Sequence, residues 1–306
     1  MFDLNTEVGM DKLKAIGKIR NLYKEGKNLM EYLRSGDSLN DAESIMISYD
    51  FQAGSYIKNA SENQTYFDKY SSMICDEIRA LGEFKSIMEV GVGEATVMAP
   101  TTQKLDPENK LIKYGFDISW SRVRHAKEYV KKFNQDISFF TANLFEIPLA
   151  DNTIDIVYTS HSLEPNGGKE REALLELYRV AAKYVVLLEP DFVRASPEAR
   201  ARMEKHGYVK DLAGFAKAAG MEVIADKPAP IYINPLNPTG ITIIRKSAEQ
   251  AGEGGLCCPI TKMPLMRDHQ ALFNQDGGLL YPIIDGIPCL LSGNAILASQ
   301  YTNFEH

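Results

Sequence analysis

From residue 83 onward, short apolar runs alternate with amphipathic stretches, and this alternation narrows the fold more than any other feature of the chain. Strands that alternate with helices form a largely parallel sheet covered by helices on both faces, so we predict an α/β fold. Residues 228–240 join the last two strands without a helix, which favours an antiparallel hairpin at the sheet edge. The seven predicted strands are residues 86–90, 111–116, 137–141, 154–159, 184–189, 221–226 and 241–246. The predicted helices are residues 94–105, 119–133, 169–182 and 208–220.

The first 82 residues have helical patterns. Apolar side chains recur at three- and four-residue spacings over residues 12–34, which predicts an amphipathic helix. Ser38 follows the end of this pattern and is a candidate N-cap for the next helix. Residues 48–81 predict two more short helices that are joined near residues 59–63. Residues 1–82 are therefore predicted to form a helical N-terminal cap.

This cap has two interpretations. Its helices either pack against the sheet for stability or form a lid over an active site. Three tyrosines are candidate lid residues because a tyrosine ring offers an apolar face with a polar tip. They are Tyr49, Tyr56 and Tyr66, of which Tyr56 is also a candidate substrate-binding residue.

The composition changes again after the last predicted strand. Residues 247–255 are small and polar, which indicates a linker. The segment after it is rich in Pro, Gly and short apolar runs and predicts a small β-rich module. The chain is thus divided into a cap (residues 1–82), a sheet domain (residues 83–247) and a linker with a C-terminal module (residues 248–306).

Charge and cysteine content limit the partners and the compartment. The 34 basic and 41 acidic residues give a net charge of -7, which disfavours a broad nucleic-acid footprint. No apolar run has the length of a membrane span, and the first residues lack the apolar segment of a signal peptide. We therefore expect a cytoplasmic protein whose four cysteines are reduced thiols.

The turn after the first predicted strand is the first candidate binding site. Gly91 and Gly93 allow the backbone to approach a ligand closely, at the end of the sheet where open α/β folds bind ligands. Glu89 lies just before this turn, and its carboxylate suits a cationic ligand and would repel a phosphate. No Gly-Lys-Ser/Thr sequence ends the loop, which excludes a Walker-type phosphate site.

The sequences EVGVGEA, YGFDIS and TANLFEIPLADNTIDIVYTSHSLE together resemble the class I S-adenosylmethionine-dependent methyltransferases. The resemblance covers residues 83–247 and implies a Rossmann-like seven-stranded sheet and S-adenosylmethionine as the cofactor. In this family an acid that ends the second strand holds the ribose hydroxyls, and Asp117 matches it. Asn143 stands where the family usually has an Asp that binds the adenine amine. The implied cofactor-binding residues are Glu89, Gly91, Gly93, Asp117, Ile118, Asn143, Leu144 and Ser160.

The acceptor of the methyl group is expected beyond the fourth strand, at residues 161–168. His161 is the candidate general base because an imidazole titrates near neutral pH. Glu164 is the candidate to orient His161 or to bind the acceptor. Asn166 either binds the acceptor or caps the following helix. Glu189, at the end of the fifth strand, is a further candidate for binding the acceptor.

The motifs Asp-Pro-Pro-Tyr and Asn-Pro-Pro-Tyr of many N-methylating relatives are absent. We therefore favour O-methylation of a hydroxyl on a small molecule or a sugar or glycan. A methyltransferase acting on tRNA, rRNA or protein is the alternative, and a cofactor-binding scaffold without activity is a third interpretation. The expected partner is therefore a small-molecule or glycan acceptor, and a nucleic acid is less favoured. We expect no membrane span. A second copy of the chain is a further candidate partner.

The C-terminal segment is similar to small zinc-ribbon-like proteins that activate methyltransferases acting on tRNA, rRNA and release factors. Residues 258–259, 264–265 and 280–288 carry this resemblance. Thr261 breaks the Cys-x-x-Cys pair that structural zinc usually needs, so we predict no metal. The module is expected to cover an apolar face of the sheet, to form a dimer, or to bind the acceptor.

Overall fold

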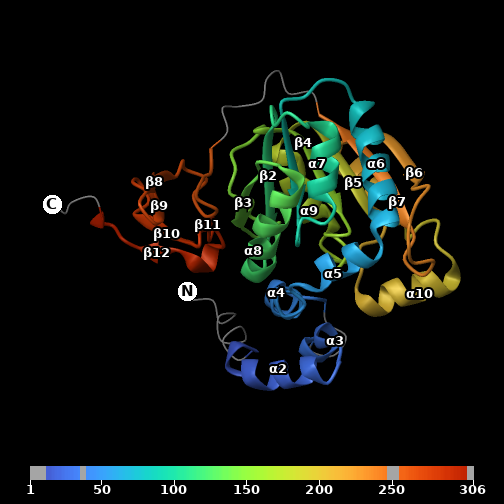
Figure 1. Cartoon of the computed structure of the whole chain (residues 1–306), viewed down its shortest axis with the longest axis horizontal. Helices are drawn as coiled ribbons and strands as arrows, with labels where there is room; N and C mark the ends of the chain where they lie inside the picture. Colours follow the sequence, from blue (N-terminus) through green and yellow to red (C-terminus); the bar gives the residue numbers. More distant parts are fainter. Residues whose placement is uncertain (1–11, 35–38, 247–254, 302–306) are drawn as a thin grey trace.

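A computed structural model describes residues 12–34, 39–246 and 255–301. Its centre is a seven-stranded sheet in the order β3-β2-β1-β4-β5-β7-β6 (Figure 1). Neighbours from β3 to β5 pair in parallel, whereas β7 is antiparallel to both β5 and β6. The α/β prediction and the edge hairpin are thus confirmed. The strands are β1 (Ser86–Val90), β2 (Ile112–Asp117), β3 (Ser138–Thr141), β4 (Ile154–Ser160), β5 (Ala181–Pro190), β6 (Glu222–Pro228) and β7 (Thr239–Arg245).

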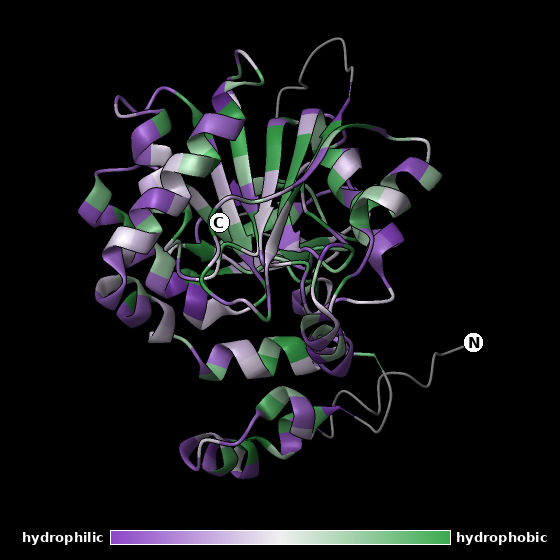
Figure 2. Ribbon diagram, turned by 90° about the vertical axis from the view of Figure 1, so that its right-hand side faces the viewer, coloured by the Kyte–Doolittle hydropathy of each residue, from purple (hydrophilic) through white to green (hydrophobic). Residues whose placement is uncertain are grey.

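Both faces of the sheet are buried, because alternate side chains of each strand point to opposite sides. On β1, Met88 and Val90 belong to one apolar core and Ile87 belongs to the other. The apolar interior of the strands and the hydrophilic outer surfaces of the helices are visible in Figure 2. The first face packs against α9 (Glu170–Val180) and α11 (Leu212–Ala218), and the second against α6 (Gln64–Arg79), α7 (Met98–Leu105) and α8 (Trp120–Tyr129).

The N-terminal region is helical, but it breaks at more places than predicted. The pattern over residues 12–34 forms two helices, because the chain turns at Gly26, which has a φ of 73°. Residues 48–81 contain a break at Gly54 in addition to the predicted one at Asn63. Ser38 lies outside the described residues, and Asp41 is the N-cap of the next helix. These helices are α2 (Ile16–Lys24), α3 (Leu29–Leu33), α4 (Ala42–Phe51) and α5 (Ser55–Glu62).

Two helix predictions within the sheet region need correction. The helix expected from residue 94 begins only at Met98, since Ala95 has a left-handed backbone with a φ of 58°. Helix α10 (Pro197–His206) was not predicted, although its ends are marked in the sequence. Ser196 accepts a hydrogen bond from the N–H of Ala199, Pro197 follows it, and Gly207 ends the helix in the left-handed region. No helix in the described ranges is long and apolar enough to cross a membrane.

The C-terminal module lies beside β3, the edge strand of the large sheet (Figure 1). Cys289 forms a parallel bridge with Thr141 of β3, and the N–H of Leu290 donates to the carbonyl of Thr141 at 2.9 Å. Tyr281 and Leu290 are fully buried in the same core as Phe140 of β3. The module therefore covers a sheet edge that would otherwise expose unpaired backbone groups. Its strands are β8 (Met266–Asp268), β9 (Ala271–Asn274), β10 (Leu279–Ile284), β11 (Ile287–Pro288) and β12 (Ile296–Leu297).

The three cysteines of the module are buried free thiols. The sulfur of Cys258 lies 3.2 Å from the hydroxyl of Tyr281 and accepts the N–H of Thr261 at 3.4 Å. Cys257 and Cys289 are buried as well. Within the described part of the chain, no three His, Cys, Asp or Glu residues are grouped so that they could hold a metal ion. These sulfur atoms are therefore part of the packing of the module.

Candidate active site

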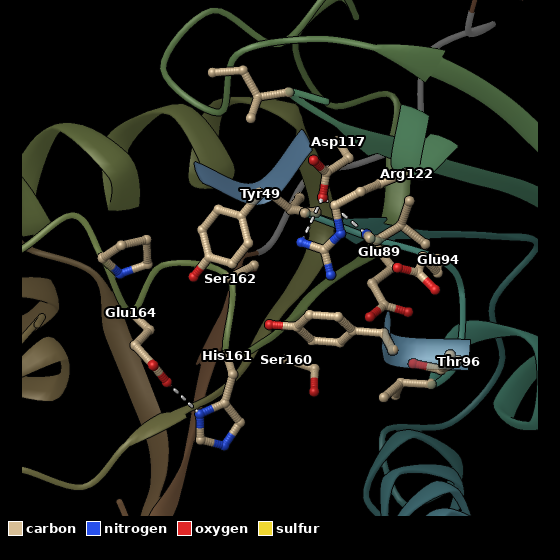
Figure 3. Close-up of a pocket in the computed structure, with 18 of the residues that line it drawn as sticks. Tyr49, Glu89, Glu94, Thr96, Asp117, Arg122, Ser160, His161, Ser162 and Glu164 are labelled. Carbon is tan, nitrogen blue, oxygen red and sulfur yellow. Dashed lines mark hydrogen bonds and ion pairs between the residues drawn. The ribbon is translucent and has the colours of Figure 1, made fainter. Parts of the chain in front are cut away.

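A cavity of about 390 Å³ lies at the carboxyl ends of β1, β2 and β4, beneath the helices of the cap. This volume is within the range of roughly 300–1,000 Å³ that small-molecule sites occupy. Tyr49 of α4, Tyr56 of α5 and Tyr66 of α6 all line it. Of the sequence-predicted site residues, the structure brings together here Tyr56, Glu89, Gly91, Gly93, Asp117, Ile118, Asn143, Leu144, Ser160, His161, Glu164 and Asn166 (Figure 3).

The glycine turn after β1 has a conformation that only glycine fills without strain. Gly91 and Gly93 have φ values of 66° and 54°. A Cβ on Gly91 would lie 2.3 Å from the Cβ of Ser162, and one on Gly93 would lie 2.6 Å from Nη2 of Arg122. The turn therefore lies so close to the loop after β4 and to the side chain of Arg122 that only residues without a Cβ fit at these two positions.

Asp117 ends β2 and closes the glycine turn. One carboxylate oxygen accepts the N–H of Gly93 at 2.9 Å, and the other accepts the N–H of Ser119 at 2.9 Å. Asn143, on the loop after β3, accepts the N–H of Phe145 at 3.1 Å, which is an Asx turn. A carbonyl oxygen has two lone pairs, so the Asn143 side chain keeps the capacity to accept a second hydrogen bond from a ligand.

Glu89 lies beneath the cavity on β1 and is 2% exposed. Its carboxylate accepts the hydroxyl proton of Tyr158 at 2.6 Å. Burial raises the pKa of Glu89 to about 8, and the Tyr158 hydrogen bond offsets only part of that effect. In the free protein at neutral pH, Glu89 is therefore largely protonated. A cationic ligand beside it would favour the ionised carboxylate.

His161 and Glu164 form a hydrogen-bonded pair on the loop after β4 (Figure 3). Nδ1 of His161 lies 2.8 Å from the Glu164 carboxylate, and Nε2 lies 2.8 Å from Oγ1 of Thr239. Burial lowers the pKa of His161, but the hydrogen bond and charge of Glu164 outweigh burial and raise that pKa. Glu164 also accepts the side-chain N–H of Asn237 at 2.9 Å. A carboxylate thus fixes the imidazole while both line the cavity.

Glu189 is not among the residues that line this cavity, and its contact with the acceptor stays a prediction. Its carboxylate accepts three successive backbone N–H groups, those of Ser162, Leu163 and Glu164, at 3.0–3.1 Å. Burial raises the pKa of Glu189 to about 7. The side chain lies beneath the loop and positions it. One of its oxygens accepts two of these N–H groups and the other accepts the third.

Two more predicted residues have structural partners inside the cavity wall. The Ser160 hydroxyl lies 3.2 Å from the hydroxyl of Tyr70. Asn166 donates its side-chain N–H to the carbonyl of Leu163 at 3.2 Å. It does not cap helix α9, whose N-cap is Lys169 without a side-chain hydrogen bond.

The cap is fastened to the sheet by two carboxylates at helix N-termini. Glu94, in the turn after β1, accepts the N–H groups of Gly54 and Ile57 at 2.8 Å each. Asp50, near the end of α4, accepts the Ser119 hydroxyl at 2.6 Å and the N–H of Ser121 at 3.2 Å. Carboxylates at these positions satisfy free N–H groups and interact favourably with the helix dipole.

We expect Glu94→Gln to loosen the cap by about 1–2 kcal/mol, because a charged acceptor of two N–H groups is replaced by a neutral one. Hydrogen exchange of residues 52–58 would measure this loosening as faster exchange. Glu62→Gln, a change at an exposed carboxylate of α5, is the matched control. Equal exchange in the Glu94→Gln variant and the wild type would contradict the fastening role.

Sequence reasoning missed several residues that line the cavity. Asn237 comes from the connection between β6 and β7, Thr239 begins β7, and Arg122 comes from α8. Ser119, two residues after Asp117, is the N-cap of α8, so the third helical residue Arg122 faces the same end of the sheet. The connection between β6 and β7 is rich in Pro and Asn, and no local pattern distinguished it from an ordinary loop.

Comparisons with known proteins agree with this geometry. Residues 87–183 match the model of a methyltransferase domain family. The fold resembles an O-methyltransferase family protein from Burkholderia thailandensis, with a TM-score of 0.53 and 17% identity over 77% of this chain and 72% of that one. A SAM-dependent methyltransferase from Aquifex aeolicus is also similar, with a TM-score of 0.43 and 19% identity over 55% of this chain and 87% of that one.

The sheet order, the glycine turn and the matched domain agree with one another. The sheet domain is a class I S-adenosylmethionine-dependent methyltransferase domain. It is therefore a methyltransferase whose cofactor is S-adenosylmethionine.

The C-terminal segment has relatives of its own. A UPF0434 protein from Saccharophagus degradans is 51% identical over 47 residues, which are 15% of this chain and 75% of that protein. One from Delftia acidovorans is 50% identical over 42 residues, which are 13% of this chain and 70% of that protein. This segment of the chain belongs to the UPF0434 family. The methyltransferase thus carries a covalently attached member of a family that also occurs as short proteins.

Proposed function

We propose that this methyltransferase transfers a methyl group to a hydroxyl of a small molecule or a sugar, with His161 as the general base. The observation that carries the proposal is the His161–Glu164 pair at the cavity. The cap helices cover the cavity, which favours an acceptor small enough to be enclosed. The similar fold of a protein named as an O-methyltransferase family member supports the same direction.

The residues of the cavity fit the cofactor. The close backbone approach at Gly91 and Gly93 leaves no room for a Cβ, and Asp117 presents carboxylate oxygens beside this turn. S-adenosylmethionine, when bound, supplies an electrophilic methyl group on a positively charged sulfur. We propose that Asp117 binds the ribose hydroxyls and that Ile118 and Leu144 pack against the adenine ring. The side-chain oxygen of Asn143 would accept a hydrogen bond from the adenine amine. Glu89, Gly91, Gly93 and Ser160 complete the proposed cofactor site.

Glu89 predicts how cofactor affinity depends on pH. Its raised pKa, about 8, means that the carboxyl is neutral in the free protein at pH 7. A cationic cofactor favours the charged form, so binding at pH 7 should release a proton, and affinity should rise from pH 6 to pH 8 by up to about tenfold per unit. Calorimetry at pH 6, 7 and 8 in buffers of different ionisation enthalpy measures both quantities.

The control for this pH dependence is Glu89→Gln, because two other groups near the cavity also have shifted pKa values. Glu164 raises the pKa of His161, and burial raises that of Glu189 to about 7. The variant cannot ionise at position 89, so its affinity should change little over the same pH range. If the wild-type protein binds the cofactor at pH 7 without releasing a proton, Glu89 does not ionise to stabilise the cationic cofactor.

The proposed chemistry needs one proton transfer. When Nδ1 of His161 donates to Glu164, Nε2 carries the lone pair and accepts from Thr239. An acceptor hydroxyl that replaces Thr239 as this partner would pass its proton to Nε2 as its oxygen forms the bond to the methyl carbon. S-adenosylmethionine, when bound, would supply that methyl carbon and would retain the electron pair of its carbon–sulfur bond as the neutral thioether. Glu164 stabilises the imidazolium that forms. Asn166 and Tyr56 are the proposed acceptor contacts.

An alternative acceptor, RNA or protein, rests on the C-terminal segment and its activator-like resemblance. Within the described ranges, however, no residue of that segment lines the cavity. Four acids line it, which disfavours a phosphate backbone. They are Glu89, Glu94, Asp117 and Glu164.

The deciding experiment is incubation of the protein with methyl-labelled S-adenosylmethionine and separate fractions of small metabolites, tRNA and proteins. We expect label in the small-metabolite fraction, stable to conditions that cleave methyl esters. Label confined to tRNA or protein would overturn the proposal. We also propose a cytoplasmic location, which the four free buried cysteines support, and a second copy of the chain as a partner.

A further inference from the structure

Arg122 is a buried cation whose Nε has no hydrogen-bond acceptor among the described residues. The residue is 6% exposed and lines the cavity. Among the residues that the structure describes, its guanidinium donates no hydrogen bond, and its Nε is buried without a partner. The closest carboxylate oxygen, on Asp117, lies 3.9 Å from Nη1. A guanidinium has five N–H donors, and leaving them unsatisfied in a buried position is costly.

The acids around Arg122 are already bound to other donors. Asp117 accepts the N–H groups of Gly93 and Ser119. Glu94 accepts those of α5 through both of its oxygens. These carboxylates lower the electrostatic cost of the cation but do not use its N–H groups. The guanidinium therefore remains available for an anion that enters the cavity.

The guanidinium is also held in place. It lies over the ring of Tyr56, 4.2 Å from the centroid, and 5.0 Å from that of Tyr49. It also approaches Gly93 so closely that a Cβ there would lie 2.6 Å from Nη2. Figure 3 shows it in the middle of the site, below Asp117 and between Tyr49 and Glu94. A planar group fixed this way is suited to bind a carboxylate through two parallel hydrogen bonds.

We propose that Arg122 binds the carboxylate of the methionine part of S-adenosylmethionine. That carboxylate is the one anionic group of the cofactor, and the guanidinium lies against the glycine turn. In the part of the chain that the structure describes, Arg122 is the one lysine or arginine that lines the cavity. The inference rests on the cofactor and is independent of the acceptor and of the role of His161.

The test compares two ligands by calorimetry on the full chain. S-adenosylhomocysteine carries the carboxylate, whereas 5′-methylthioadenosine keeps the adenosine and the thioether but lacks the amino-acid part. We expect Arg122→Gln to lower the affinity for S-adenosylhomocysteine about 10- to 100-fold, which is the effect of losing hydrogen bonds to a charged group. The affinity for 5′-methylthioadenosine should fall less than about threefold. Arg122→Lys should recover part of the loss. Arg124→Gln, an exposed change on the same helix, should leave both affinities unchanged.

Equal losses of affinity for the two ligands would overturn the proposal. Arg122 would then act on the adenosine part of the ligand or on the position of the cap. No loss for either ligand would overturn it as well. Circular dichroism and the thermal midpoint establish that each variant is folded. If Arg122→Gln does not fold, the affinities of the wild-type protein for the two ligands test the proposal. Equal affinities for S-adenosylhomocysteine and 5′-methylthioadenosine would exclude a carboxylate contact of this strength.

Discussion

The His161→Ala variant is expected to bind S-adenosylmethionine with wild-type affinity and to transfer its methyl group about 10²–10⁴-fold more slowly, the usual contribution of a general base. The reason is that Nε2 of His161 lies beside the cavity while Glu164 holds the other ring nitrogen. Calorimetry measures the binding, and label transferred to the small-metabolite fraction measures the turnover. Full turnover in this variant would remove His161 as the base.

The pH profile separates a base from a merely structural histidine. The base must be deprotonated, so activity should rise with pH through the pKa of His161, which Glu164 raises. Glu164→Gln removes the charge that raises this pKa, so the same rise should occur at lower pH. Loss of turnover in Glu164→Gln without a shift of the profile would assign Glu164 to acceptor binding.

The second large effect is expected at the contact between the C-terminal module and the sheet. Tyr281→Ala should lower the free energy of unfolding by about 3–5 kcal/mol, as for other large aromatic side chains removed from a core. Tyr281 is fully buried, shares its core with Phe140 of the edge strand, and lies next to Cys258. Urea denaturation measures this difference.

Two variants serve as controls for this stability effect. Leu297→Ala removes a side chain that is 77% exposed on the same module and should change stability by less than about 0.5 kcal/mol. Tyr281→Phe removes only the hydroxyl beside Cys258 and should cost about 0.5–1.5 kcal/mol. A Tyr281→Ala protein as stable as the Leu297→Ala protein would show that the module adds no stability through this contact.

Local patterns predicted most of the sheet domain correctly. All seven strands of the sheet could be predicted because each contains a short run of apolar residues in the sequence. The antiparallel hairpin at the edge was readable because its connection is too short for a crossover helix. The residues around Gly91 and Asp117 were found from their positions at the ends of strands, and the structure brings them to one cavity.

Helix ends were predicted less well, because they depend on side chains from distant segments. The helix expected from residue 94 starts later because Ala95 has a left-handed backbone, and the Glu94 side chain before it binds the N–H groups of α5. The helix after Ser196 was missed although its N-cap and C-cap residues are typical. Its apolar pattern is weak, because only two of its residues are buried.

By itself, the sequence determined the strand–helix alternation, the glycine turn and the strand-end acid, because burial period and backbone freedom are properties of neighbouring residues. Only the tertiary structure decided that Glu189 supports the loop from below, that Arg122 faces the cavity, and that the C-terminal module covers β3. These outcomes depend on contacts between residues far apart in the chain. A buried carboxylate or guanidinium takes its role from whichever donors and acceptors the fold places around it, and no local spacing records those partners.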